Sequence, residues 1–261
     1  MTPEEDPFIA AIAADPADEV VRLVYSDWLE ERGEDARAAY LRAEAAHFRA
    51  SAAERRNDEW CEMPGVDPIW AAMVSRTEIL VTGLTFSDTG PKLMRADLKA
   101  IEDHWGHPLP PDYAAFLLLY NGGRPSKPYL WSYLDGEDFY DEVRFFSTCD
   151  TRAEGGRELL SNPGEILLPH YNPKALARFE RMMPIGTLTY AYDDYDDKEN
   201  ILALVLGSVP PLEDRLVEIE WSQLHGLRRA EDVHAKETFA SLLHALVKGP
   251  SADELPTHSH R

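Results

Sequence analysis

The chain has 261 residues, a length that suits one large domain or two small ones, and its hydrophobic fraction of 44% is enough for a packed core. It carries 47 acidic residues against 26 Lys and Arg, and the formal net charge of −21 argues against binding to nucleic acid or to an anionic membrane surface through basic patches. The charge favours a basic partner, or serves solubility alone. Cys61 and Cys149 lack the spacing of a zinc ribbon or a redox pair. No signal-peptide pattern or long apolar run is present, so we expect a cytoplasmic protein with no membrane partner.

Residues 1–78 predict a helical module. Asp6-Pro7 begins the first helix, Asp18 is placed to cap a second, and a third begins near Asp35. The second helix ends before Gly33, which suits a left-handed C-cap. Its apolar residues recur with helical spacing and form one face: Val20, Leu23, Val24 and Trp28.

The segments from Phe8 to Pro16 and from Arg22 to Gly33 resemble the repeat-companion domain. This domain is a short helical module at the N-terminus of many multi-domain proteins in planctomycetes and in myxobacteria-like genomes. The resemblance covers about residues 4–45. It implies a modular protein and implies no particular chemistry.

Residues 79–250 predict a second domain of mixed type, followed by a disordered tail at residues 251–261. One strand is expected at Ile79–Phe86, and an amphipathic helix is expected to end at Gly106. Further helices are expected at residues 110–120, 172–182 and 239–248. Short apolar runs predict five more strands, at Tyr129–Leu134, Val143–Phe146, Leu188–Tyr192, Ile201–Leu206 and Leu216–Trp221.

One motif of this domain combines helix entry, a core face and a left-handed exit. Leu109 and Phe116 are expected in the core, and Tyr113 is expected to offer its hydroxyl to a polar partner. The exit at Asn121 and Gly122 requires residues that tolerate positive φ. The full set, including a later Ile-Gly element, is Leu109, Pro110, Tyr113, Phe116, Leu117, Asn121, Gly122, Gly123, Ile185 and Gly186.

In this order the motif resembles the SUKH superfamily, of the Smi–Knr type, over about residues 88–248. The resemblance implies an α+β fold with a mostly antiparallel sheet flanked by helices. It also implies protein binding, because bacterial members are mostly immunity proteins that neutralise polymorphic toxins, often nucleases. Eukaryotic relatives act as interaction hubs in cell-wall signalling.

Two acidic clusters that include tyrosine are the candidate binding residues. Carboxylates steer a basic partner, and tyrosine supplies contact area at low entropic cost. Solvated loop tips are the competing interpretation, and the spacing of the second cluster is not that of an EF-hand. The candidates are Asp135, Glu137, Asp138, Tyr140, Asp141, Glu142, Asp193, Asp194, Tyr195, Asp196 and Asp197.

No catalytic or metal-ligating pattern stands out, since the histidines are scattered and no Gly-x-Ser-x-Gly or phosphate-loop spacing occurs. The sequence therefore predicts a non-enzymatic protein without a cofactor, which binds a basic partner such as a secreted nuclease toxin. Two alternatives stay open at this point. One is a regulatory or scaffolding module without a toxin partner, and the other is a hydrolase of unrecognised type.

Overall fold

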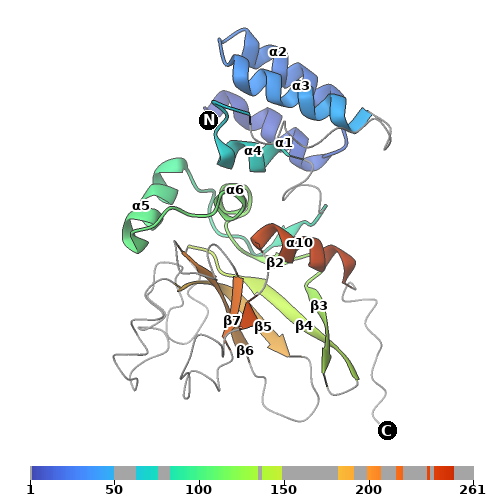
Figure 1. The fold of residues 1–261 in the computed structure, drawn as a ribbon, viewed down its shortest axis with the longest axis vertical. Helices are drawn as coiled ribbons and strands as arrows, with labels where there is room; N and C mark the ends of the chain where they lie inside the picture. The colour runs from blue at the N-terminus through green and yellow to red at the C-terminus, as the bar shows by residue number, and fades with distance from the viewer. Residues whose placement is uncertain are drawn as a thin grey trace. The chain divides into compact units, whose positions relative to one another are not determined.

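The chain divides into two compact units, Met1–Gly83 (unit 1) and Leu84–Arg261 (unit 2), in a computed structural model (Figure 1). The structure describes residues 2–49, 63–75, 83–134, 137–148, 182–190, 199–206, 216–219, 234–235 and 238–249. Within them, the backbone alone is described for residues 131–139, 190, 199–201, 216–219 and 234–235. Unit 1 is helical in its described part, and unit 2 combines helices with antiparallel sheets, so the predicted α+β class is confirmed. No helix within these ranges is long and apolar enough to span a bilayer.

The described elements of unit 1 are η1 (Pro3–Glu5), α1 (Asp6–Ala14), α2 (Glu19–Glu30), α3 (Asp35–Arg49) and α4 (Pro68–Val74). Acidic residues cap two of these helices, because a carboxylate satisfies N–H groups that have no partner inside the helix. Asp18 accepts a hydrogen bond from the Val20 N–H (2.8 Å) at the start of α2, and Asp67 does the same for Ile69 (2.9 Å) at the start of α4. Between α2 and α3, Gly33 takes the left-handed conformation with φ +76°. The two helices then lie side by side (Figure 1).

The buried face of α2 is not the apolar face that hydropathy predicts. Val20 and Val24 are 67% and 53% exposed, whereas Arg22, Tyr25 and Leu29 are buried. The helix turns this partly polar face inward because the neighbouring segments supply hydrogen-bond partners for its polar atoms. The prediction from hydropathy was therefore wrong at this helix.

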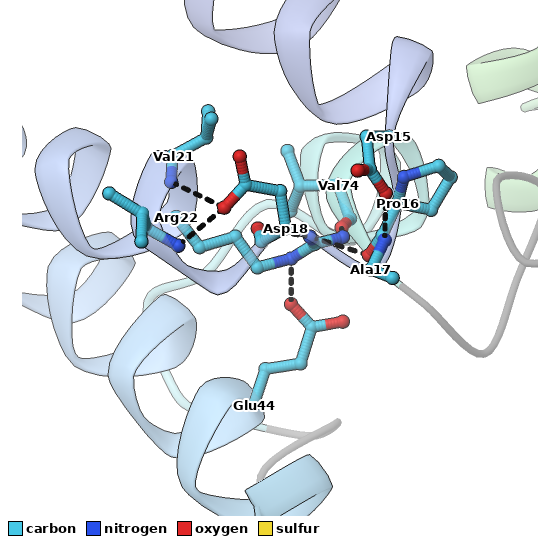
Figure 2. A network of polar contacts seen from close by, with 9 residues as sticks. Asp15, Pro16, Ala17, Asp18, Val21, Arg22, Glu44 and Val74 are labelled. Atoms are coloured by element: carbon cyan, nitrogen blue, oxygen red, sulfur yellow. Dashed lines mark hydrogen bonds and ion pairs between the residues drawn. The ribbon is translucent and has the colours of Figure 1, made fainter.

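Arg22 is the centre of the first polar network in unit 1 (Figure 2). Its Nε donates to Glu44 at 3.0 Å, and both side chains are fully buried. The other guanidinium nitrogens donate to the carbonyl oxygens of Pro16 (2.7 Å), Asp18 (3.2 Å) and Val74 (3.0 Å). A charge can be buried here because an opposite charge and several acceptors replace the lost water. These contacts join α2 to α3 and to the end of α4.

A second network surrounds Glu5. The Tyr25 hydroxyl donates to the Glu5 carboxylate at 2.6 Å, and it accepts from Arg37 (3.1 Å) and from the Trp70 indole (3.2 Å). Arg37 also donates to Glu5. Burial raises the pKa of Glu5, but hydrogen bonds from Arg37, Tyr25 and Thr2 outweigh it, so the pKa lies below its ordinary value. Burial raises the pKa of Tyr25.

Unit 2 is built on a six-stranded antiparallel sheet in the order β3-β4-β5-β6-β7-β8. Its strands are β3 (Tyr129–Leu134), β4 (Glu137–Phe145), β5 (Met182–Tyr190), β6 (Glu199–Val205), β7 (Leu216–Ile219) and β8 (His234–Ala235). A smaller sheet pairs β1 (Phe86–Ser87) with β2 (Arg124–Pro125). The described helices are α5 (Arg95–Trp105), α6 (Pro111–Leu119) and α10 (Phe239–Lys248).

Two strands begin earlier than the sequence predicts. β4 begins at Glu137 rather than Val143, because the ladder to β3, which pairs residues 137–142, outweighs the low strand propensity of Asp and Glu. β5 begins at Met182, which the sequence assigns to the end of a helix. The proline in β5, Pro184, lies at a register irregularity, where a residue without an N–H is tolerated. The expected strand at 79–86 reduces to Phe86–Ser87 in the described part, and β8 was not predicted.

An aromatic core joins α6 and α10 to the sheet face that they cover (Figure 1). Phe116 on α6, Phe145 on β4 and Phe239 on α10 are fully buried, with ring centroids 4.9–5.4 Å apart. Aromatic pairs at this separation contribute beyond the area that they bury. The expectation that Leu109 and Phe116 are core residues agrees with their burial.

Candidate partner-binding surface

Asn121 holds the corner after α6. Its side-chain amide donates to the Pro91 carbonyl (2.8 Å) and to the Thr148 hydroxyl (3.0 Å), and its side-chain oxygen accepts from the Thr148 N–H (3.1 Å). Asn121 is buried and has φ +51°, a conformation that Asn tolerates better than most residues. It thereby connects α6 to two loops that are distant in the sequence.

The glycines that follow are required by space as well as by backbone angle. Gly122 has φ +82°, and a Cβ at this position would collide with the Phe146 carbonyl. Gly123 has φ +106°, and a Cβ there would collide with the Ser87 carbonyl. The positive φ predicted for Gly122 is confirmed.

The helical part of the motif also packs in the interior. The buried members are Leu109, Pro110, Tyr113, Phe116 and Leu117. The Tyr113 hydroxyl, expected to reach a polar partner, is fully buried without a hydrogen-bond partner among the described residues. Burial raises its pKa. The later Ile-Gly element lies on β5, where a Cβ at Gly186 would collide with the Arg144 carbonyl of β4.

The first acidic cluster lies on β4 rather than in a loop. We call residues 137–142 the acidic segment of β4. Register places Glu137 opposite Leu134 and Asp138 opposite Tyr133 of β3. Asp135 lies outside the described residues, as do Asp193, Asp194, Tyr195, Asp196 and Asp197 of the second cluster.

The strand separates the members of this segment because successive residues face opposite sides of a sheet. Asp141 shares the side of Val143 and Phe145, toward α6 and α10, and is 7% exposed. Tyr140 and Glu142 lie on the opposite side and are half-buried. A partner that approaches β4 from the side away from α6 and α10 therefore meets Tyr140 and Glu142, and not Asp141.

Glu142 has a partner that the sequence did not identify. Arg124 of β2 makes an ion pair with it at 3.0 Å, with the two side chains 44% and 34% exposed. No sequence signal joins these residues, since only the pairing of strands brings them together. Within the described residues, no group of three or more His, Cys, Asp or Glu is arranged to hold a metal ion.

Residues 93–206 match the model of the SMI1/KNR4 family (SUKH-1). The match extends from just before α5 to just after β6, and it contains the motif residues and the acidic segment of β4. It supports a SUKH-1 domain in this part of the chain. No curated protein and no solved structure matches the chain.

Proposed function

We propose that the chain is a non-enzymatic immunity protein that binds and neutralises a toxin. The observation that carries the proposal is the SUKH-1 match at residues 93–206. The resemblance to this superfamily implies protein binding, and for bacterial members it most often implies binding to a toxin. A nuclease toxin is the partner class that we favour, because enzymes that bind nucleic acid present basic surfaces.

The motif residues themselves are committed to folding. Phe116 packs in the aromatic core, and Asn121 and Gly122 hold the corner that connects three segments. The residues that bind the partner are therefore expected among those on the surface of the domain. The acidic segment of β4 is the best candidate, since it lies within the matched segment and presents the half-buried Tyr140 and Glu142 on the side away from α6 and α10.

Electrostatics supports a basic partner. A chain with a net charge of −21 attracts a cationic surface over distances of about 8–10 Å at physiological ionic strength. In this mechanism the acidic surface speeds encounter, and tyrosine contacts then slow dissociation. The bound protein blocks the active site of the toxin sterically, without chemistry.

Unit 1 enters the proposal as a repeat-companion module in residues 1–78 that accompanies the binding domain of residues 79–250. The repeat-companion domain occurs at the N-terminus of multi-domain proteins, and the proposed order of the two domains in this chain is the same. The site of action that we propose is the cytoplasm, where a nuclease toxin would meet its substrate.

The test first searches the genes beside that of this chain for one that encodes a nuclease toxin, and it then uses the full chain with the purified toxin domain. Association rates are measured from low to high salt for the wild type and for a Glu137→Gln/Asp138→Asn/Glu142→Gln variant. We expect binding whose association rate falls steeply with salt, and a variant that associates at least tenfold more slowly. Its melting temperature should change little, because the Arg124–Glu142 ion pair that it breaks is partly exposed to solvent. The charge control is Glu31→Gln in unit 1, whose side chain is 78% exposed. Absence of binding, or failure to protect cells from that toxin, contradicts the proposal.

A further inference from the structure

The two edges of the large sheet differ in length. β8 at one edge has two residues, whereas β3 at the other has six. Sheets commonly limit unwanted pairing by keeping edge strands short or by placing Lys or Pro on them. The sequence of β3, from Tyr129 to Leu134, has neither and carries three aromatic residues.

The register shows which backbone groups of β3 face outward. Val143 of β4 donates its N–H to the Pro128 carbonyl at 2.6 Å. Hydrogen-bonded and non-hydrogen-bonded pairs alternate along an antiparallel ladder. The N–H and C=O groups of Leu130, Ser132 and Leu134 therefore face β4, and those of residues 129, 131 and 133 face the outer edge.

The first of these outward positions is covered by α10. Gly249, directly after α10, lies so close to Tyr129 that a Cβ would collide with the Tyr129 carbonyl. Lys127 also donates to the Val247 carbonyl (3.0 Å) at this end of the helix. No described strand pairs with the outer edge at the remaining positions, Trp131 and Tyr133. Within the described part of the chain, this open edge of β3, residues 131–133, offers two N–H and two C=O groups.

We propose that the open edge of β3 binds an extended, basic segment of the partner protein as an added antiparallel strand. The inference rests on the proposed function for the existence of the partner and adds how it is held. Main-chain hydrogen bonds to an exposed edge give affinity with little dependence on sequence, and alternate side chains give specificity.

The negative charge near this edge favours the addition of a basic strand. Glu137 and Asp138 lie one strand inward, opposite Leu134 and Tyr133. An added strand would lie two strand spacings from them, about 10 Å, which is within the range of electrostatic attraction. A second copy of this chain would instead bring together two molecules of charge −21, so self-pairing through this edge is disfavoured.

The probe is a twelve-residue peptide of alternating lysine and valine, added to the full chain. We expect it to bind and to protect the amides of Trp131 and Tyr133 from hydrogen exchange. The amides of Ser132 and Leu134 should be protected with and without it. The same peptide with glutamate for lysine should not bind, and N-methylation of its four central amides should weaken binding at least tenfold.

Two variants test the edge from the side of the protein. Tyr133→Pro removes an outward N–H and should weaken peptide binding at least tenfold, since proline is tolerated where the N–H faces away from the sheet. Tyr133→Val is the matched control, keeps the N–H and should bind within threefold of the wild type. If Tyr133→Pro does not fold, the N-methylated peptide on the wild-type chain decides.

The proposal is overturned if the lysine–valine peptide does not bind, if the N-methylated peptide binds equally well, or if Trp131 and Tyr133 gain no protection. These outcomes are separate from failure of the proposed function. A toxin domain that binds wild type and Tyr133→Pro equally supports the function and overturns the added strand. Peptide binding at the edge without toxin binding supports the added strand and contradicts the function.

Discussion

The two units of the chain stabilise their interiors in different ways. Unit 1 buries an Arg22–Glu44 ion pair and a Glu5–Tyr25 hydrogen bond among its helices. Unit 2 packs Phe116, Phe145 and Phe239 between its helices and its sheet. A buried polar network is sensitive to the loss of one partner, because the remaining charge is then buried without compensation. An aromatic core tolerates changes in shape better, and it is sensitive mainly to lost volume.

The largest effect is expected at the buried ion pair. Glu44→Ala leaves the Arg22 guanidinium buried without its counter-charge and should lower the free energy of unfolding by about 3–5 kcal/mol. Urea unfolding of the full chain, with hydrogen exchange to locate the change in unit 1, measures it. The double variant Arg22→Met/Glu44→Leu should recover most of the loss. A double variant as unstable as Glu44→Ala would show that the carbonyl contacts of Arg22 dominate.

Phe116→Ala should produce a loss of the same size in unit 2. Phe116 is fully buried against two other rings, and truncation of such a residue costs about 3–5 kcal/mol. Phe116→Leu retains most of the volume and should cost clearly less. The same unfolding measurement checks both variants. Equal losses for Ala and Leu would mean that ring geometry, rather than volume, holds this core.

Substitution of two glycines allows the cost of a left-handed backbone to be measured separately from the cost of a steric collision. Gly106 and Gly122 both have positive φ, but space around a Cβ is open at Gly106, whereas Gly122 faces the Phe146 carbonyl. Gly106→Ala should cost about 1–2 kcal/mol from the left-handed conformation alone. Gly122→Ala should cost about 1–3 kcal/mol more, and Gly122→Val at least as much as Gly122→Ala. Thermal melts compare them, and similar losses for the two alanine variants would contradict the collision.

Acid should weaken unit 1 through Glu5. Because its pKa in the folded state is below the ordinary 4.5, ionised Glu5 stabilises the fold above that pH, and the stabilisation is lost as the pH falls through the folded-state pKa. Glu5→Gln should remove this part of the acid sensitivity and lower stability at neutral pH. Unfolding free energies between pH 7 and pH 3 test it. An unchanged pH profile in Glu5→Gln would assign the acid sensitivity to other carboxylates.

The smallest effect on stability is expected at Tyr113, whose hydroxyl is a polar group within the apolar core of unit 2. Its hydroxyl is buried without a hydrogen-bond partner among the described residues, and such a group destabilises the folded state. Tyr113→Phe should therefore leave stability unchanged or raise it by up to about 1 kcal/mol. A melting temperature that falls by several degrees would reveal a partner elsewhere in the chain.

Local signals in the sequence predicted much of the fold correctly. Asp18 caps α2, Gly33 and Gly122 have positive φ, and Phe116 is buried. Each of these depends on the chemistry of a few neighbouring residues, such as a carboxylate beside unpaired N–H groups. The mixed class followed from the alternation of helical and strand patterns, which is also local.

Strand length was less accessible from sequence. The acidic segment of β4 contains four acidic residues, which disfavour strands, and β4 includes it because β3 supplies a ladder along its whole length and β5 joins from Asp141 on. The same pairing places Asp141 in the interior and Glu142 on the opposite side of the strand. The candidate binding residues were thus recognised by composition, but their division between two sides depends on register.

What the sequence determined by itself was the class of fold, the acidic charge and the motif that resembles the SUKH superfamily. Only the tertiary structure decided that Arg22 is buried while Val20 is exposed, that Arg124 pairs with Glu142, and that β3 lies at an edge. The physical reason is the separation along the sequence over which each kind of interaction acts. Caps, turns and hydrophobic periodicity act within a few residues, whereas a buried charge needs partners such as Glu44 and Val74, which folding brings to Arg22 from distant positions.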